Sequence, residues 1–157
     1  MVSRETKWEG HQLNQTTIAV HEIVRDLLLV GVFLQKTGNR ITRDFGLTQQ
    51  QFTVLYEIAN HDAVNQKHLV GALLLEKSNV SKIVNFIQSR GLIRISISAD
   101  DARATWLSIT RKGKKTVCDC IKALHAWNTM WLEPLDEKEI VSAEKILYRL
   151  KGLIRQL

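Results

Sequence analysis

The sequence predicts a mainly α-helical fold with one small β-hairpin, and three patterns support this fold class. Apolar residues recur every three or four positions along much of the 157-residue chain, which is the spacing of helices that bury one face. Residues 92–98 and 105–109 instead alternate between apolar and polar side chains, as the two strands of a hairpin do. Residues that favour helix ends stand at the borders of the helical segments.

The first predicted helix covers residues 17–45 and ends at Gly46, because glycine is a common helix terminator. Its apolar positions form a broad stripe rather than a narrow seam, which predicts that a wide face of this helix is buried. The stripe consists of Val20, Ile23, Val24, Leu27, Leu28, Val30 and Leu34.

Two shorter helices are expected in residues 47–73. Thr48 and Gln51 have the spacing of a capping box, so a helix should start here and run to about residue 60. Residues 61–64 are expected to form a connector. Asn65 then caps a short helix.

The next helix is predicted in residues 76–91, with Ser78 as its N-cap and Gly91 as its end. One side of this helix is apolar and is expected in the core: Val80, Ile83, Val84 and Ile87. The opposite side carries short hydrogen-bonding side chains and one cation, and no acid: Asn79, Ser81, Lys82 and Asn85. A face of this composition suits base edges and phosphates.

Two helices are predicted after the hairpin. Thr110 caps the first, which ends before Pro134, and Asp136 with Glu139 resembles a second capping box. The last helix spaces its apolar residues alternately three and four positions apart, which is the seam pattern of a coiled coil. These residues are Ile140, Ala143, Leu147, Leu150, Ile154 and Leu157. The alternative is that this seam packs inside the monomer, and the sequence leaves both possibilities open.

The net charge of +6 originates in one segment of the chain. Residues 1–75 and residues 117–157 each contain equal numbers of basic and acidic side chains. Residues 76–116 contain nine basic and three acidic side chains, so this segment carries the whole excess. Clustered charge is often only a solvated surface, but its confinement to one segment favours a polyanionic partner.

The order of the elements indicates a winged helix-turn-helix. Two short helices, a turn, a helix with a polar face and a hairpin with a basic tip follow one another without interruption. A helix fits the major groove of DNA, where each base pair displays its own pattern of donors and acceptors. A hairpin beside that helix can place a cation in the minor groove, where negative potential is concentrated.

Four motifs in register resemble the MarR family of transcriptional regulators. They are Leu47 to Phe52, Lys77 to Val84, Arg90 to Ile93, and the wing stretch Asp101-Ala102-Arg103 with the trailing Leu107-Ser108-Ile109-Thr110 and Gly113. Ile109 replaces the leucine that is usual in the family pattern. Together the motifs cover roughly residues 47–116, and the flanking helices match the family in placement.

The resemblance implies a homodimer with a DNA-binding lobe in each protomer. Residues 1–46 would form an N-terminal arm and dimerisation helix, 47–116 the winged helix-turn-helix lobe, and 117–157 the C-terminal dimerisation helices. A two-fold dimer should bind a pseudo-palindromic operator in double-stranded DNA. Its half-sites should lie about one helical turn apart, roughly 34–36 Å.

The resemblance also implies roles for individual residues. Residues 78–89 would be the recognition helix, and Arg103 would enter the minor groove with Asp101 supporting the wing. Lys77 and Lys82 are expected at phosphates, which position the helix without reading the sequence. The remaining candidates for DNA contacts are Ser78, Asn79, Ser81, Asn85 and Arg94.

Many relatives release DNA when a small phenolic or other amphipathic molecule binds between the dimerisation helices and the DNA-binding lobe. By this resemblance, the expected function is a sequence-specific repressor that such an effector releases. The aromatic and histidine candidates for the pocket, for which ordinary packing is the alternative, are Trp8, His11, His21, His125, Trp127 and Trp131. The operator, the regulated genes, the effector and the choice between repression and activation leave no recognisable pattern in the sequence.

Two alternative functions stay open at this point. Cys118 and Cys120 point to nearly opposite sides of a helix, so small packed side chains are expected, although a redox-responsive regulator would use these thiols. A winged helix that binds an acidic protein instead of DNA is the second alternative.

Other function classes lack support in the sequence. We find no glycine-rich phosphate loop, nucleophile elbow or His-Glu zinc motif, so no enzyme, cofactor or metal site is expected. The first ten residues are polar, and the longest apolar run, Leu27 to Leu34, is short. Neither a secretory signal nor a membrane span is predicted, and a cytoplasmic location is expected.

Overall fold

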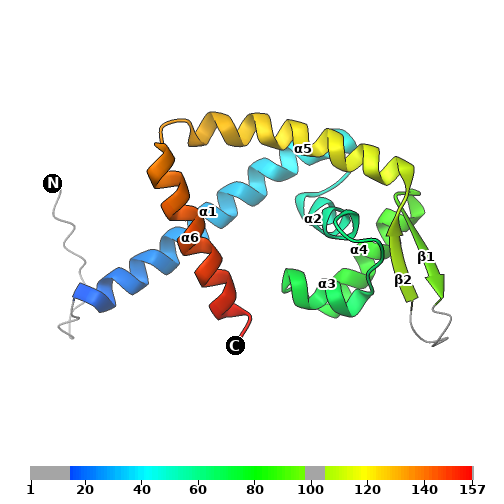
Figure 1. Cartoon of the computed structure of the whole chain (residues 1–157), viewed down its shortest axis with the longest axis horizontal. Coiled ribbons are helices and arrows are strands. Elements are labelled where there is room, and N and C mark those ends of the chain that lie inside the picture. The colour runs from blue at the N-terminus through cyan, green and yellow to red at the C-terminus, as the bar shows by residue number, and fades with distance from the viewer. Residues whose placement is uncertain (1–14, 98–104, 157) are drawn as a thin grey trace.

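The structure is a computed structural model that describes residues 15–97 and 105–156, and its elements follow the expected order (Figure 1). The helices are α1 (Gln15–Thr42), α2 (Gln49–Ala59), α3 (Gln66–Leu73), α4 (Lys77–Ser89), α5 (Arg111–Leu132) and α6 (Glu137–Ile154). A short 3-10 turn, η1 (Arg43–Phe45), follows α1, and β1 (Ile93–Ile97) pairs with β2 (Thr105–Ile109) in an antiparallel hairpin. The predicted mainly helical fold with a hairpin wing is confirmed.

The apolar core lies in the lobe that α2, α3, α4 and the hairpin form. The stripe predicted for α4 is buried, and Val80, Val84 and Ile87 expose none of their surface. Leu55 and Ile58 of α2 belong to the same buried cluster. Each large apolar side chain contributes about 1.5–3 kcal/mol when it leaves water. The meeting of these stripes therefore holds the lobe together and fixes which side of α4 faces outward.

The predicted capping residues make the expected hydrogen bonds. Thr48 Oγ1 accepts the backbone N–H of Gln51 at 3.2 Å, and the side-chain oxygen of Gln51 accepts the N–H of Thr48 at 2.9 Å. Asp136 and Glu139 make the same reciprocal pair before α6. Asn65 Oδ1 accepts a backbone N–H of the first turn of α3 at 2.8 Å. These local bonds explain why α2, α3 and α6 begin where they do.

The start of α4 differs from the expectation, because Ser78 is not its N-cap. The backbone carbonyl of Glu76 accepts the N–H groups of Asn79 and Val80, both at 3.0 Å, so helical bonding already includes Ser78. Glu76 is the N-cap, and its side chain makes no capping hydrogen bond within the described chain. Ser78 therefore lies in the first turn of α4, where it is exposed.

The hairpin has the predicted faces. Ile93 pairs with Ile109 and Ile95 pairs with Leu107, so the apolar side chains of both strands lie on one side. Val64, which was expected in a simple connector, forms an additional β-bridge to Leu107 through hydrogen bonds of 3.0 and 2.7 Å. This bridge joins the segment between α2 and α3 to the wing.

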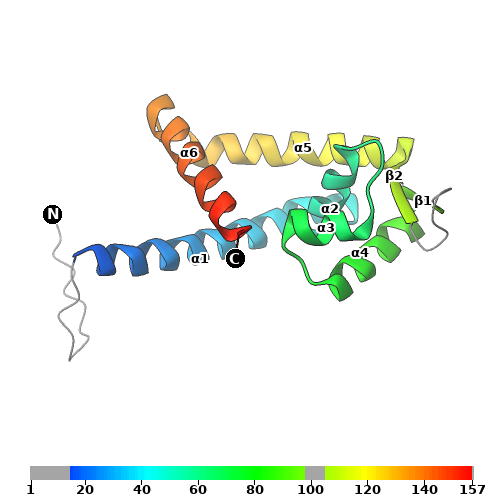
Figure 2. The ribbon, with the colours of Figure 1, turned by 60° about the horizontal axis from the view of Figure 1, so that its bottom comes forward.

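The long helices extend away from the lobe. In Figures 1 and 2 the blue half of α1 and the start of α6 lie far from the hairpin. We call residues 16–34 of α1 together with α6 the arm. Within α6, all of which is described, no residue is buried, and Leu28 and Val32 of α1 expose 67 % and 65 % of their surface. No helix in the described residues is long and apolar enough to cross a membrane.

Candidate nucleic-acid interface

Half of the eight residues that the sequence assigned to DNA contacts are exposed on α4. Lys77, Ser78, Lys82 and Asn85 are exposed, and the last three share one side of the helix because they are four and three positions apart. Every residue of α4 is described, and none of them is acidic. The outward side of α4 therefore presents cations and short hydrogen-bonding groups together.

Asn79 and Ser81 are placed differently, because each is only partly exposed and bonds to a neighbouring helix. Asn79 Nδ2 donates to Gln50 Oε1 of α2 at 3.1 Å. The Ser81 hydroxyl donates to Gln66 Oε1 of α3 at 2.8 Å. These bonds tie α4 to the first turns of α2 and α3, and they leave the oxygens of Asn79 and Ser81 as acceptors.

Gln50 and Gln66 also adjoin this surface through their bonds to Asn79 and Ser81, and no sequence pattern singled them out. Gln50 and Gln66 lie in the first turns of α2 and α3, and Lys67 is an exposed cation beside Gln66. A polar residue in a first helical turn normally indicates only a solvated helix end. The signal that could have found them is the convergence of helix starts that a helix-turn-helix produces, and this appears only when the fold is considered as a whole.

Arg94 lies exposed on β1, and the base of the wing that carries it is held firmly against α5. The Thr110 hydroxyl lies 2.8 Å from the Gly91 carbonyl oxygen, to which it donates, and its oxygen accepts the Gly113 N–H at 3.0 Å. A Cβ atom added at Gly113 would lie 2.1 Å from the backbone oxygen of Leu92. Only glycine allows this close approach, so the family pattern's glycine has a steric reason here.

Several predicted site residues lie outside the described residues: Asp101 and Arg103, which were expected at the hairpin tip, and Trp8 and His11. The two other histidines considered for an effector pocket are both exposed, His21 on α1 and His125 on α5. The structure thus brings neither of these histidines into an enclosed site.

The two tryptophans considered for the pocket do come together, at the junction of α1 and α5. Their ring centroids, those of Trp127 and Trp131, lie 5.8 Å apart, and Phe33 of α1 lies 5.5 and 6.0 Å from them. One helical turn beyond Phe33, a cleft opens along α1. Its lining residues are Lys36, Thr37, Asn39, Arg40 and Arg43. An aromatic surface and a cationic cleft therefore adjoin each other on α1, and the sequence analysis missed Phe33 and the cations.

The two cysteines occupy different environments on α5, as expected from their spacing. Cys118 is exposed, whereas Cys120 is fully buried, and both thiols are free. Burial raises the pKa of the Cys120 thiol to about 11, so this thiol stays protonated and unreactive at neutral pH. Cys120 is a core residue, and Cys118 is the accessible one of the chain's two thiols.

Two histidines meet although they come from different elements. His61 follows the end of α2, and His68 lies in the first turn of α3, with Glu57 between them. No metal site was expected from the sequence, because it contains no His-Glu zinc motif. The turn between α2 and α3 produces the pairing instead.

Comparison with known proteins finds similarity to one family in part of this chain. A model of the MarR family matches residues 45–104, which begin at the last residue of η1 and end just before β2. A transcriptional regulatory protein proposed for the hcr operon of Thauera aromatica is 28 % identical over 112 residues, which cover 69 % of this chain and 68 % of that protein.

Solved structures of regulators have the same fold at low sequence identity. A mutant of MarR from Escherichia coli in complex with operator DNA aligns with a TM-score of 0.76 and 16 % identity, over 84 % of this chain and 95 % of that one. The organohalide-sensing regulator RdhR-CbdbA1625, in its form bound to 2,4-dichlorophenol, aligns with a TM-score of 0.77 and 18 % identity, over 96 % and 90 %. The matching family model, the helix order, the wing and the capped helix starts together make this chain similar to the MarR family of transcriptional regulators.

Proposed function

We propose that this chain regulates transcription by binding a specific sequence in double-stranded DNA as a homodimer, and that it acts as a repressor released by a small effector. The observation that carries the proposal is the outward side of α4, which presents two lysines and short hydrogen-bonding side chains without an acid. The similar fold of MarR from Escherichia coli, which was crystallised with operator DNA, supports this use of the lobe.

In this proposal α4 lies in the major groove. Lys77 and Lys82 neutralise phosphates and set the position of the helix. Base edges are read by the hydroxyl and amide side chains of the helix: Ser78, Asn79, Ser81 and Asn85. Gln50 and Gln66 hold Asn79 and Ser81 in place through the bonds of 3.1 and 2.8 Å. Preformed orientation of this kind reduces the conformational entropy lost on binding.

The wing supplies the second set of proposed contacts. Arg94 on β1 meets a phosphate, and Arg103 enters the minor groove with Asp101 supporting it, as the family motif implies. The firm base of the wing supports this assignment, because Thr110 and Gly113 hold the start of α5 close to the strand. The functional lobe of the proposal is therefore residues 47–116.

The arm supports the proposed homodimer. Leucine, valine and phenylalanine side chains are exposed at nearly every position from 27 to 34 of α1, so this part of the helix is apolar all round. A helix of this kind is stable in water only when other surfaces cover it from several directions. A second copy of the arm provides those surfaces, so we assign residues 1–46 and 117–157 to dimerisation.

The proposed effector is a small aromatic molecule with an acidic or phenolic group. Phe33, Trp127 and Trp131 offer an apolar aromatic surface, and the cleft one turn further along α1 contains Lys36, Arg40 and Arg43. Aromatic rings and cations in this order suit a molecule that has one apolar and one negatively charged end. The structural similarity to a regulator that was crystallised with 2,4-dichlorophenol supports this chemical class.

Selection of bound sequences from a random pool of duplex DNA at moderate salt tests the DNA-binding proposal. We expect a pseudo-palindrome whose half-sites lie about one helical turn apart. Arg103→Ala should then weaken binding to the selected site by about 1–3 kcal/mol, and Lys82→Ala should lower the slope of log K against log salt by about one unit. Lys145→Ala in α6 removes the same charge outside the lobe. It should change neither the affinity for the selected site nor the slope of log K against log salt.

If the selection enriches no sequence and every duplex binds equally weakly, the proposal is contradicted. This result would favour the alternative of a winged helix that binds an acidic protein.

The redox alternative has a separate test. At neutral pH a thiol reagent should label Cys118 and leave Cys120 unlabelled in the folded protein, because burial keeps the latter thiol protonated. If peroxide leaves the DNA binding of the unchanged chain as unaffected as that of a Cys118→Ser variant, the redox function is excluded.

A further inference from the structure

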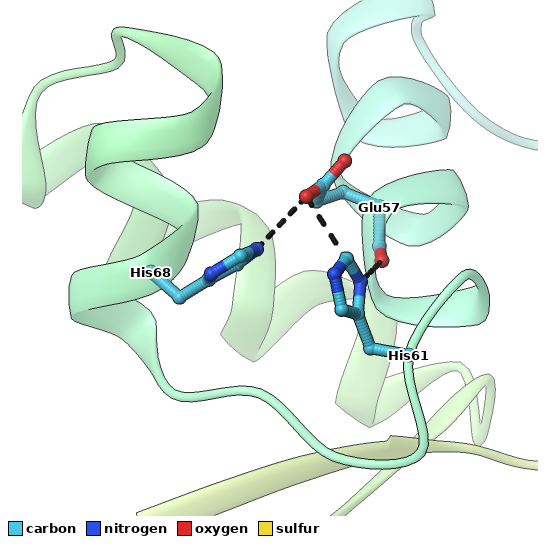
Figure 3. Close-up of side chains that lie close together, drawn as sticks. All are labelled: Glu57, His61 and His68. Carbon is cyan, nitrogen blue, oxygen red and sulfur yellow. Dashed lines mark hydrogen bonds and ion pairs between the residues drawn. The ribbon is translucent and has the colours of Figure 1, made fainter.

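Glu57, His61 and His68 form a compact group of potential metal ligands between α2 and α3 (Figure 3). One ligand atom from each of the three side chains lies within 4.8 Å of the other two. His68 Nε2 lies 2.8 Å from Glu57 Oε1, and His61 Nδ1 lies 4.0 Å from the same oxygen. The imidazole rings meet edge to face, with their centroids 4.8 Å apart.

The hydrogen bonding of His61 leaves one of its ring nitrogens ready to bind a cation. Nδ1 lies 2.9 Å from the backbone oxygen of Glu57, which can only accept, so the proton of the neutral ring must be on Nδ1. Nε2 then keeps its lone pair. Metal-bound histidines commonly donate their second N–H to a backbone carbonyl, which orients the ring, and His61 has this arrangement already.

The backbone that carries the three side chains is well anchored. Ile58, the neighbour of Glu57, and Leu69, the neighbour of His68, are both fully buried. The backbone N–H of His68 is bound by the Asn65 cap at 2.8 Å. The three functional groups themselves remain accessible, because Glu57, His61 and His68 expose 21 %, 41 % and 39 % of their side chains. A rigid frame with accessible ligands favours binding of an ion from solution.

We propose that Glu57, His61 and His68 bind one divalent transition-metal ion, with zinc(II) as the best match, and that the ion links α2 to α3. Two imidazoles and one carboxylate are typical zinc ligands, whereas magnesium and calcium prefer oxygen ligands alone. Ligand atoms around tetrahedral zinc lie about 3.4 Å apart, as follows from bond lengths of about 2.1 Å. His68 Nε2 and Glu57 Oε1 lie 2.8 Å apart, and one potential ligand atom of each of the three side chains lies within 4.8 Å of the others, so side-chain rotations can bring His61 Nε2 to this spacing. Water completes the fourth position.

Ion binding would replace the hydrogen bond between His68 and Glu57. The ion takes the place of the proton on His68 Nε2, and a neutral ring keeps its proton by carrying it on Nδ1. The new link would join the end of α2 to the helix whose Gln66 holds Ser81. A structural consequence is therefore expected in the lobe itself, and it can be measured without DNA.

Isothermal titration of the untagged, chelator-treated full chain with zinc chloride tests the proposal. We expect one ion per chain with micromolar or tighter affinity, and a rise in the midpoint of thermal unfolding. His61→Ala and His68→Ala should each weaken binding at least tenfold. His125→Ala removes an exposed histidine of α5 and should leave binding unchanged, and magnesium chloride should give no binding.

Glu57→Gln provides the sharpest variant, because an amide oxygen can still accept the hydrogen bond from His68 but is a poor zinc ligand. Its unfolding midpoint without metal should match that of the unchanged chain, while the increase caused by zinc should be lost. Cobalt(II) should give the visible absorption of a tetrahedral complex, and this signal should disappear in His68→Ala. Undiminished zinc binding in Glu57→Gln and His68→Ala would overturn the proposal. Since no step involves DNA, this outcome is independent of the proposed regulatory function.

Discussion

The lobe and the arm are built from similar amphipathic helices, yet they bury their apolar residues to very different extents. In the lobe, the stripes of α2 and α4 meet, and Leu55 and Val84 expose none of their surface. In the arm, Leu28 and Tyr148 expose 67 % and 68 % of theirs. The lobe thus buries its apolar side chains within one chain, whereas the apolar side chains of the arm need a second surface that covers them.

This difference separates two tasks that a regulator must perform. The core of the lobe fixes the direction of the polar side of α4, while in the proposed homodimer the arm would determine the distance between two such lobes. Residues next to the arm touch the lobe at defined points, because Asn39 follows the arm's segment of α1 and Arg155 follows α6. The N–H of Gln49 donates to Asn39 Oδ1 of α1 at 2.8 Å, and Arg155 at the end of α6 donates to the Ala72 carbonyl at 3.1 Å. A change in the arm therefore has direct contacts through which it reaches α2 and α3.

The largest expected effect concerns the core of the lobe. Leu55→Ala should lower the free energy of unfolding by about 2–5 kcal/mol, because it removes buried methyl groups and leaves a cavity. Ile97→Ala shortens a side chain that is 70 % exposed on the hairpin, and it should change stability by less than about 0.5 kcal/mol. Urea denaturation followed by circular dichroism measures both. If the two variants lost similar amounts of free energy of unfolding, the buried core of the lobe would not be the main source of stability.

The next effect tests the close contact between the wing base and α5. Gly113→Ala should destabilise the chain by about 3 kcal/mol, because its Cβ would lie 2.1 Å from a backbone oxygen that cannot rotate away. Gly71→Ala is the matched control, since no atom of the described part of the chain lies within 4 Å of a Cβ there. It should stabilise α3 by about 0.5–1 kcal/mol through helix propensity. A neutral Gly113→Ala in the same denaturation experiment would contradict the contact.

A smaller effect is expected in the arm, and it concerns association rather than folding. Leu147→Asp should raise the dissociation constant of the homodimer at least tenfold, or about 1.4 kcal/mol, because it places a charge in the apolar seam of α6. Ser142→Asp introduces the same charge outside that seam. Sedimentation equilibrium measures the dissociation constants. A dimer that tolerates Leu147→Asp as well as Ser142→Asp would show that the seam of α6 is not the contact surface.

The fold was largely predictable because its signals are local. The capping boxes of Thr48 and Asp136 involve residues three positions apart, and such pairs are visible in sequence. Ser78 was misplaced because a hydroxyl residue before an apolar stripe usually indicates a cap, whereas here the backbone carbonyl of Glu76 starts the helix. Val64 was missed as a sheet partner because a single bridging residue has no periodicity.

The candidate site was predictable only as a composition. The helical period assigns Lys82 and Asn85 to the outward side of α4, but it cannot reveal which members of the face bond to other helices. Asn79 bonds to a residue 29 positions away, and Ser81 to one 15 positions away. The pairing of Glu57 with His68 likewise spans 11 positions and a turn. Contacts of this range depend on how the helices pack, and no short pattern encodes them.

The smallest predicted effect asks whether the lobe and the arm unfold together. Thr48 and Asp136 cap α2 and α6 with the same pair of hydrogen bonds, so Thr48→Ala and Asp136→Ala should each cost about 1 kcal/mol if both helices belong to one cooperative unit. Thr48→Ser keeps the hydroxyl and should cost only a few tenths of that. If the far-ultraviolet signal of Asp136→Ala instead loses a fraction at low urea while the main transition stays in place, α6 unfolds separately. The arm would then be ordered only when a partner protomer covers it. The lobe and the arm would differ in stability as well as in the burial of their apolar residues.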